Sequence, residues 1–116
     1  MNRLEHLRGF ALTLPGATLV RQWGDSLVFK VAGKVFLVAG EEAGILLHLS
    51  FKCTPAEFDE LTDLDGIRQA PYFARRHWVQ LEDPAALSTE ALETCIRRSH
   101  ELVVAGLTKR ARLALT

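Results

Sequence analysis

Three consecutive segments with strand character, joined by two short turns, constrain the fold of this chain most. They are rich in β-branched and large apolar residues and span Ser26–Val31, Lys34–Ala39 and Ile45–Lys52. Ala32-Gly33 forms the first connection, and residues 40–44 form the second. Connections this short can join only antiparallel neighbours. The sequence therefore predicts an antiparallel meander.

Side-chain alternation assigns the two faces of these strands, because residues two apart point to the same side. Leu47 and Leu49 lie on one side of the third strand, which we expect to be core. His48, Ser50 and Lys52 lie on the other side, which we expect to be partly exposed. With residues of a C-terminal helix included, the predicted core is Leu27, Phe29, Val31, Leu47, Leu49, Leu92, Ile96 and Val103.

Helices are predicted on both sides of the meander in sequence. Apolar residues recur at helical spacing from Leu4 to Leu14, and Pro15-Gly16 ends that pattern. Thr54-Pro55-Ala56-Glu57 has the pattern of a capping box with proline at the first helical position. A second helix should therefore begin at Thr54 and end near Gly66.

A further strand and a long helix complete the prediction. His77–Leu81 has strand character, with Trp78 and Gln80 on one side. Ser88 is placed to cap a long helix that carries Leu92, Ile96 and Val103 on its apolar stripe. These elements indicate an α+β fold.

Length and composition fit one folded domain covering residues 1–116. Apolar residues make up 48% and charged residues 24% of the chain, a balance typical of a globular protein. The 14 Lys and Arg residues equal the 14 Asp and Glu residues in number. Any nucleic-acid contact must therefore rest on a local patch of positive charge, because the molecule as a whole has no net positive charge.

The sequence favours a cytoplasmic protein with no membrane partner. The first residues lack the unbroken apolar stretch of a secretory signal, and charged residues interrupt the most apolar run, Leu27–Leu49. Cys53 and Cys95 have no neighbouring Cys or His at the spacing of a zinc or redox site. We interpret both as reduced, buried thiols.

Motifs for catalysis, metal binding or cofactor binding are not found. The glycines around residues 33–44 lack the pattern of a phosphate-binding loop. His6, His48, His77 and His100 are scattered over four predicted elements, without the spacing of a helical metal site. We therefore expect a protein that is not an enzyme, with no catalytic residue, no metal site and no cofactor.

The segment Tyr72–Trp78 is the most unusual in composition, with three aromatic residues, two arginines and a histidine among seven residues. In one interpretation, Arg75 and Arg76 neutralise phosphates or carboxylates while Trp78 offers a stacking surface. In the other, Tyr72 and Trp78 pack in the core or at its rim and the arginines only improve solubility. Residue types alone leave both interpretations open.

Several segments, in this order, resemble the MmcQ/YjbR family of small bacterial proteins, and the resemblance spans nearly the whole chain. They are Leu14-Pro15-Gly16-Ala17, Asp25–Phe36, Leu49–Cys53, Tyr72 with Arg75–Trp78, and Ile96–Val104. The resemblance implies an antiparallel sheet backed by helices on one side, related to the frataxin-like (CyaY-like) fold. Members are described as DNA-binding proteins with a double wing, a description that rests on fold analogy.

The resemblance also suggests individual residues. The family's basic-His-Trp motif falls on Arg76, His77 and Trp78, and its sheet lysine falls on Lys52. The chain departs from the family pattern at Ala74, where an asparagine is common, and at His100, where a tyrosine is common. Frataxin-like proteins that handle iron carry an acidic ridge on the first helix, where this chain has only Glu5. We therefore expect no iron site.

Two functional hypotheses follow. The first is a non-enzymatic DNA-binding domain that uses the exposed sheet face and its edge. The second is a domain that binds a small anion or a protein partner on the same face. For either hypothesis the candidate site residues are Lys52, Arg75, Arg76, Trp78 and His48.

Overall fold

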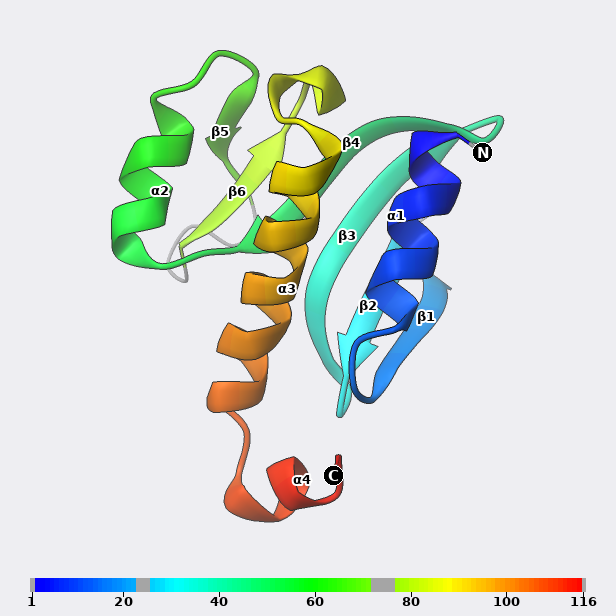
Figure 1. Ribbon diagram of the computed structural model, residues 1–116, viewed down its shortest axis with the longest axis vertical. Coiled ribbons are helices and arrows are strands. Elements are labelled where there is room, and N and C mark those ends of the chain that lie inside the picture. Colours follow the sequence, from blue (N-terminus) through cyan, green and yellow to red (C-terminus); the bar gives the residue numbers. More distant parts are fainter. Residues whose placement is uncertain (1, 23–25, 72–76, 116) are drawn as a thin grey trace.

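The computed structural model describes residues 2–22, 26–71 and 77–115, and Figure 1 shows how they are arranged. Helices and strands follow one another in the order α1 (Arg3–Leu12), β1 (Ala17–Gln22), β2 (Ser26–Val31), β3 (Lys34–Glu42), β4 (Ile45–Lys52), α2 (Pro55–Thr62), β5 (Ile67–Gln69), β6 (Trp78–Leu81), the short 3₁₀ helix η2 (Pro84–Ala86), α3 (Thr89–Ala105) and α4 (Lys109–Leu113).

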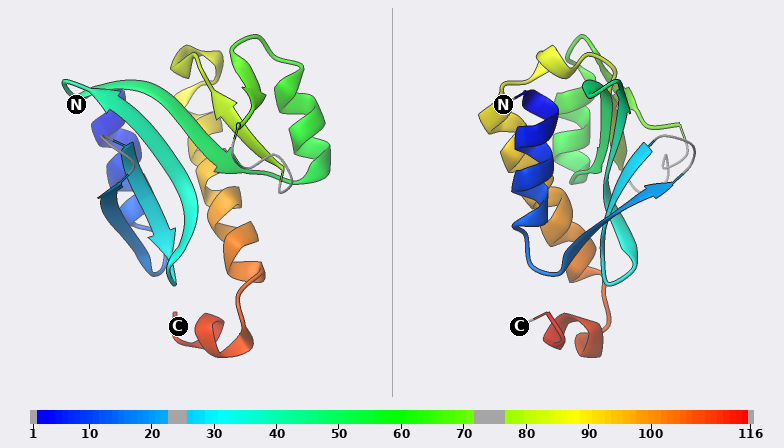
Figure 2. Two further views of the ribbon diagram at one scale, coloured as in Figure 1. Left: turned by 180° about the vertical axis from the view of Figure 1, so that it is seen from behind. Right: turned by 90° about the vertical axis from the view of Figure 1, so that its right-hand side faces the viewer.

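The strands form one six-stranded sheet in the order β1-β2-β3-β4-β6-β5, and every neighbouring pair is antiparallel. Helices α1 and α3 lie on the same side of this sheet (Figure 2). Helix α2 lies beside the β5 end of the sheet (Figure 1). The predicted α+β fold, an antiparallel sheet backed by helices on one side, is confirmed.

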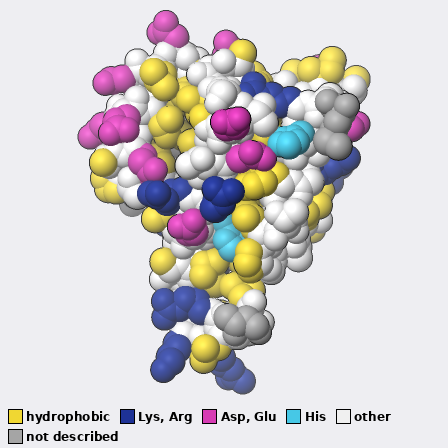
Figure 3. Space-filling model, in the orientation of Figure 1, with side chains coloured by type: hydrophobic (Ala, Val, Ile, Leu, Met, Phe, Trp, Pro, Cys, Tyr) yellow, Lys and Arg dark blue, Asp and Glu magenta, His cyan; other side chains and the backbone are white. Residues whose placement is uncertain are grey.

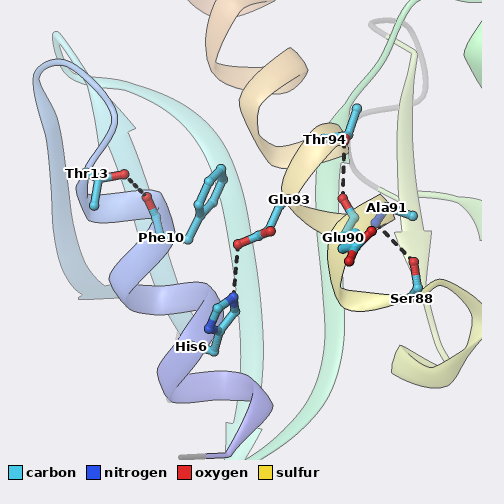
Figure 4. Close-up of polar contacts among 8 residues, drawn as sticks. All are labelled: His6, Phe10, Thr13, Ser88, Glu90, Ala91, Glu93 and Thr94. Atoms are coloured by element: carbon cyan, nitrogen blue, oxygen red, sulfur yellow. Dashed lines mark hydrogen bonds and ion pairs between the residues drawn. The ribbon is translucent and has the colours of Figure 1, made fainter.

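Local capping interactions begin the helices where the sequence predicts. The Thr54 backbone N–H donates to Glu57 Oε1 (2.9 Å), and the Glu57 N–H donates to Thr54 Oγ1 (3.2 Å), which completes the capping box. Helix α2 ends at Thr62, earlier than predicted, and Gly66 forms the following turn with a φ of +87°. At the start of α3, Ser88 Oγ accepts from the Ala91 N–H at 3.1 Å (Figure 4).

Helices α1 and α3 are joined both by packing and by a polar contact. Leu4, Leu7 and Ala11 of α1 are buried in the main core. At the helix surfaces, His6 Nε2 lies 2.9 Å from Glu93 Oε2 (Figure 4). Because this pair is partly exposed, we assign the packing, rather than the ion pair, most of the stabilisation.

Two strands were not predicted from the sequence. β1 is the edge strand beside β2, with Leu19 opposite Phe29. β5 has only three residues and pairs with the outer edge of β6, with Ile67 opposite Leu81. Neither segment has a long apolar run of its own, so the pairing with a neighbouring strand decides its conformation.

The buried core contains six of the eight predicted residues, and Val103 is partly buried and packs against it. The prediction for Leu47 is wrong. Gly40 pairs with His48 and Glu41 pairs with Leu46, so Leu47 is an extra residue in β4 without a partner in β3. Such a bulge interrupts the alternation of side chains. Leu47 is consequently 44% exposed, and Leu46 packs against the core in its place.

The face of the sheet opposite the helices is less exposed than the alternation predicts. Val28 and Val38 are directly opposite each other on β2 and β3, and both are buried. Ser50, the partner of Val38 on β4, is also buried, and its hydroxyl lies 3.4 Å from Gln80 Oε1. The centre of this face is therefore not an open polar surface.

Candidate functional site

Ser99 of α3 joins β3 to β4 where the two strands separate. Their last paired residues at this end are Leu37 and Phe51. Beyond this pair, Ser99 Oγ donates to the Phe36 carbonyl oxygen (2.6 Å) and accepts from the Lys52 backbone N–H (2.9 Å). Because Ser99 is fully buried, its hydroxyl satisfies two backbone groups that the diverging strands leave unpaired. Figure 2 shows the divergence of β3 and β4 beside α3.

A hollow with a volume of about 420 Å³ opens beyond this bridge. The β2–β3 turn, the start of β3, the end of β4, the start of β6 and the C-terminal end of α3 line it, through Gly33, Lys34, Val35, Lys52, Trp78, Val103, Gly106 and Leu107. None of these eight residues is acidic. The hollow therefore combines apolar walls with two lysines.

Two of the predicted site residues meet in this hollow. Lys52 and Trp78 are direct partners across β4 and β6, and both line the hollow. The Trp78 side chain is only 3% exposed, so it packs in the interior and does not offer an open stacking face. Of the two interpretations of Trp78, the structure favours packing.

His48 lies apart from the hollow. It is four residues before Lys52, which along a strand corresponds to about 13 Å, and it pairs with Gly40. The imidazole lies over the Gly40 backbone, so that a Cβ on Gly40 would come within 2.1 Å of His48 Nε2. The expected cluster of Lys52, His48 and an indole on one surface therefore includes only Lys52 and Trp78.

The remaining predicted site residues, Arg75 and Arg76, lie outside the described residues, as does Ala74. His77 is described, and it is exposed with a φ of 55°. Its ring meets the ring of Phe58 edge-on, with centroids 5.6 Å apart. Of the basic-His-Trp motif, the described part thus contributes one packed tryptophan and one histidine at a turn.

A group of cations outside the predicted site residues lies next to the hollow. Helix α4 begins two residues after Leu107 and carries Lys109, Arg110 and Arg112, all exposed. Figure 3 shows Lys and Arg side chains gathered over α4 at one end of the molecule. With Lys34 and Lys52 of the hollow they form what we call the basic end: Lys34, Lys52, Lys109, Arg110 and Arg112. The signal was present in the sequence as a short basic run near the C-terminus.

The C-terminal segment is anchored to the sheet. Leu115, just after α4, packs against the core. A Cβ on Gly16, which has a φ of +71°, would lie 2.4 Å from Leu115 Cδ2 and 3.4 Å from Val31 Cγ2. This close approach explains why a residue without a side chain stands at position 16. It also holds α4 near the β2–β3 turn, as Figure 1 shows.

The basic end differs in its pairing from three arginines elsewhere in the molecule. Arg21, Arg68 and Arg98 each form an ion pair with a glutamate, at N–O distances of 3.0 to 3.3 Å. Within the described part of the chain, no ion pair is found for any of the five cations of the basic end. Moreover, no acidic residue follows Glu101 in the sequence. Positive charge therefore accumulates at this end although the whole chain is neutral.

His100 of α3 has a structural role. His100 is buried, and its Nε2–H donates to the Pro15 carbonyl oxygen at 2.8 Å, because a carbonyl can only accept. Its ring meets Phe36 edge-on, with centroids 5.2 Å apart. His100 thus ties α3 to the turn after α1.

The two thiols are not poised for chemistry. Burial raises the pKa of Cys53 to about 12, and that of Cys95 to about 11, with nearby Glu57 adding to both shifts. A thiol is a nucleophile only as its thiolate. Among the described residues, no group of three or more His, Cys, Asp or Glu side chains is arranged to hold a metal ion.

The model of the YjbR family matches residues 12–102. This chain belongs to the YjbR family. The matched range contains Lys34, Lys52 and Trp78 but ends before α4. Among the helices of the described residues, none is long and apolar enough to span a membrane.

Relatives of this YjbR chain agree with that assignment. The uncharacterized protein YbdF of Escherichia coli O157:H7 is 29% identical over 108 residues, which cover 91% of this chain and 88% of YbdF. The crystal structure of Deinococcus radiodurans DR2400, described by the domain DUF419, matches with a TM-score of 0.83 and 26% identity, over 97% of this chain and 86% of that one. A Pseudomonas syringae protein shares the fold, with a TM-score of 0.66 and 19% identity, over 88% of this chain and 98% of its own.

Proposed function

We propose that this YjbR-family chain is a non-enzymatic, cytoplasmic DNA-binding domain that contacts the phosphate backbone through its basic end. The observation that carries this proposal is the segregation of charge. Five cations without an ion pair among the described residues gather at one end of a chain whose net charge is zero. Such a patch attracts phosphates even when the net charge of the whole molecule is zero.

The basic end should contact the phosphate backbone of DNA rather than the bases. Trp78 is buried, so within the described residues it adds no exposed ring on which a base could stack. Helix α4 has five residues and its polar surface is cationic, which suits phosphates better than base edges. Binding should accordingly be weakly sequence-dependent and steeply salt-dependent.

A labelled DNA duplex titrated at several salt concentrations tests this proposal by fluorescence anisotropy. Arg112→Gln removes one charge from the basic end, and Arg8→Gln is its matched control on the exposed side of α1. Arg112→Gln should weaken binding and reduce the slope of log K against log salt by about one, because one fewer counterion is released. Arg8→Gln should change neither quantity.

Two results would refute the proposal. If duplex DNA, single-stranded DNA and RNA all fail to bind at low salt, nucleic acid is not the partner, and the hypothesis of a small anion or a protein partner replaces it. If Arg8→Gln reduces the slope as much as Arg112→Gln does, the contact is spread over the surface rather than made by the basic end.

A further inference from the structure

The hollow beside Ser99 has two features of a small-molecule site that a phosphate-binding surface does not need, namely its volume and its apolar walls. Its volume of about 420 Å³ is in the range of small-molecule pockets. Val35, Val103 and Leu107 contribute apolar walls, and Lys34 and Lys52 contribute the cations. A flat surface that contacts only phosphates needs no apolar recess.

The hollow is a consequence of how the fold is built, and its walls are held in place. The Lys52 backbone nitrogen is held 2.9 Å from Ser99 Oγ of α3, and β3 and β4 separate beyond this hydrogen bond. The helix supplies Val103 one turn further along and ends at Gly106, so that both strands and the helix end face the same space. A preformed recess requires little reorganisation when a ligand enters.

We propose that this hollow binds a small organic anion, whose charged group lies at Lys34 and Lys52 and whose apolar body lies against Val103 and Leu107. An anion is favoured because two of the lining residues are lysines and none is acidic. An organic body is favoured because an inorganic ion would leave the apolar walls in contact with water. This inference does not rest on DNA binding.

Amide NMR of the full-length ¹⁵N-labelled protein titrated with octanoate tests the site. Gly33 and Gly106 line the hollow, so their amide signals should shift, whereas those of Gly9 in α1 and Gly66 beside Asp83 should not. Octanol, which has the same body without charge, and inorganic phosphate, which has charge without a body, should each bind at least about tenfold more weakly than octanoate.

Lys52→Gln tests the charge in the hollow, and two further variants separate this site from the DNA contact. Lys52→Gln should weaken octanoate about tenfold, because it removes a charge-assisted hydrogen bond. Lys109→Gln, the matched lysine outside the hollow, should leave octanoate binding unchanged while it weakens duplex binding. Gly106→Leu places a side chain at the hollow and should abolish octanoate binding while duplex binding persists. Its fold should survive, because Gly106 has a φ of −86° and a Cβ there approaches nothing closer than 3.5 Å.

The proposal is overturned if octanol or phosphate binds as tightly as octanoate, or if Lys109→Gln weakens octanoate as much as Lys52→Gln does. Shifts that avoid Gly33 and Gly106 would also overturn it. Failure of the duplex titration alone leaves the octanoate result intact, so the two proposals fail separately.

Discussion

The hydroxyl of Ser99 accepts a hydrogen bond from the Lys52 backbone N–H at 2.9 Å, and this contact fixes the end of β4 to α3. The same hydroxyl donates to the Phe36 carbonyl oxygen, so one side chain closes the gap between two strands. The sheet can therefore open at this end without leaving buried backbone groups unpaired.

Ser99→Ala should destabilise the protein by about 1–3 kcal/mol, because it leaves the buried Phe36 carbonyl and Lys52 N–H without their partner. Urea unfolding measures this change. Ser88→Ala removes a serine that only caps the start of α3 and serves as the comparison, with an expected loss of about 1 kcal/mol. A Ser99→Ala protein as stable as the wild type would mean that water replaces the hydroxyl.

The bulge in β4 predicts opposite results for two neighbouring leucines. Leu49→Ala should cost about 2–5 kcal/mol, because Leu49 is fully buried in the main core. Leu47→Ala should stay within about 0.5 kcal/mol, because the bulge exposes Leu47. Thermal unfolding of both variants checks the register, and equal losses would contradict it.

Trp78→Ala should destabilise the protein by about 3–5 kcal/mol, because a large buried side chain is removed. Trp78→Phe keeps most of the volume and should lose much less. Chemical denaturation followed by circular dichroism gives both values. A Trp78→Ala protein of normal stability would mean that the Trp78 indole lies at the surface and not in the interior.

Thr54→Ala should cost about 1 kcal/mol through loss of the side-chain half of the capping box, although Thr54 lies outside both proposed binding regions. Thr54→Ser keeps the hydroxyl and should be close to neutral. The comparison by urea unfolding separates the capping hydrogen bond from the methyl group of threonine.

Stability should fall at alkaline pH through the two thiols. The unfolded chain releases the thiol protons near the ordinary pKa of 9.0, whereas burial raises the pKa of Cys53 to about 12 and that of Cys95 to about 11 in the folded protein. The folded state thus binds more protons above pH 9, so the free energy of unfolding decreases as pH rises from 9 towards 12. Below pH 9 both thiols are protonated in the folded and the unfolded state, so this loss of stability is absent there.

A Cys53→Ala, Cys95→Ala double variant isolates that effect from the titration of lysines. Its stability curve should be flatter than that of the wild type between pH 9 and 11, as measured by urea unfolding at each pH. Thiol reagents at pH 8 should also label the folded wild type far more slowly than the unfolded chain. Rapid labelling of the folded protein would show that the thiols are accessible and ionised.

The sequence by itself determined the features that depend on near neighbours. The capping box at Thr54 joins residues three apart, and the spacing of the apolar stripe in α3 needs only helical geometry. Short connections are enough to impose an antiparallel meander on β2, β3 and β4. Family membership could also be inferred, because it rests on segments in a given order.

The tertiary structure decided the features that depend on which strands and helices meet. Exposure of Leu47 follows from a bulge that only the pairing of β3 with β4 defines. β1 and β5 are strands because β2 and β6 pair with them. The position of Lys52 in a hollow beside α3 depends on Ser99, 47 residues later in the chain. No local pattern encodes these contacts, because their energy depends on the packing of segments that are distant in sequence.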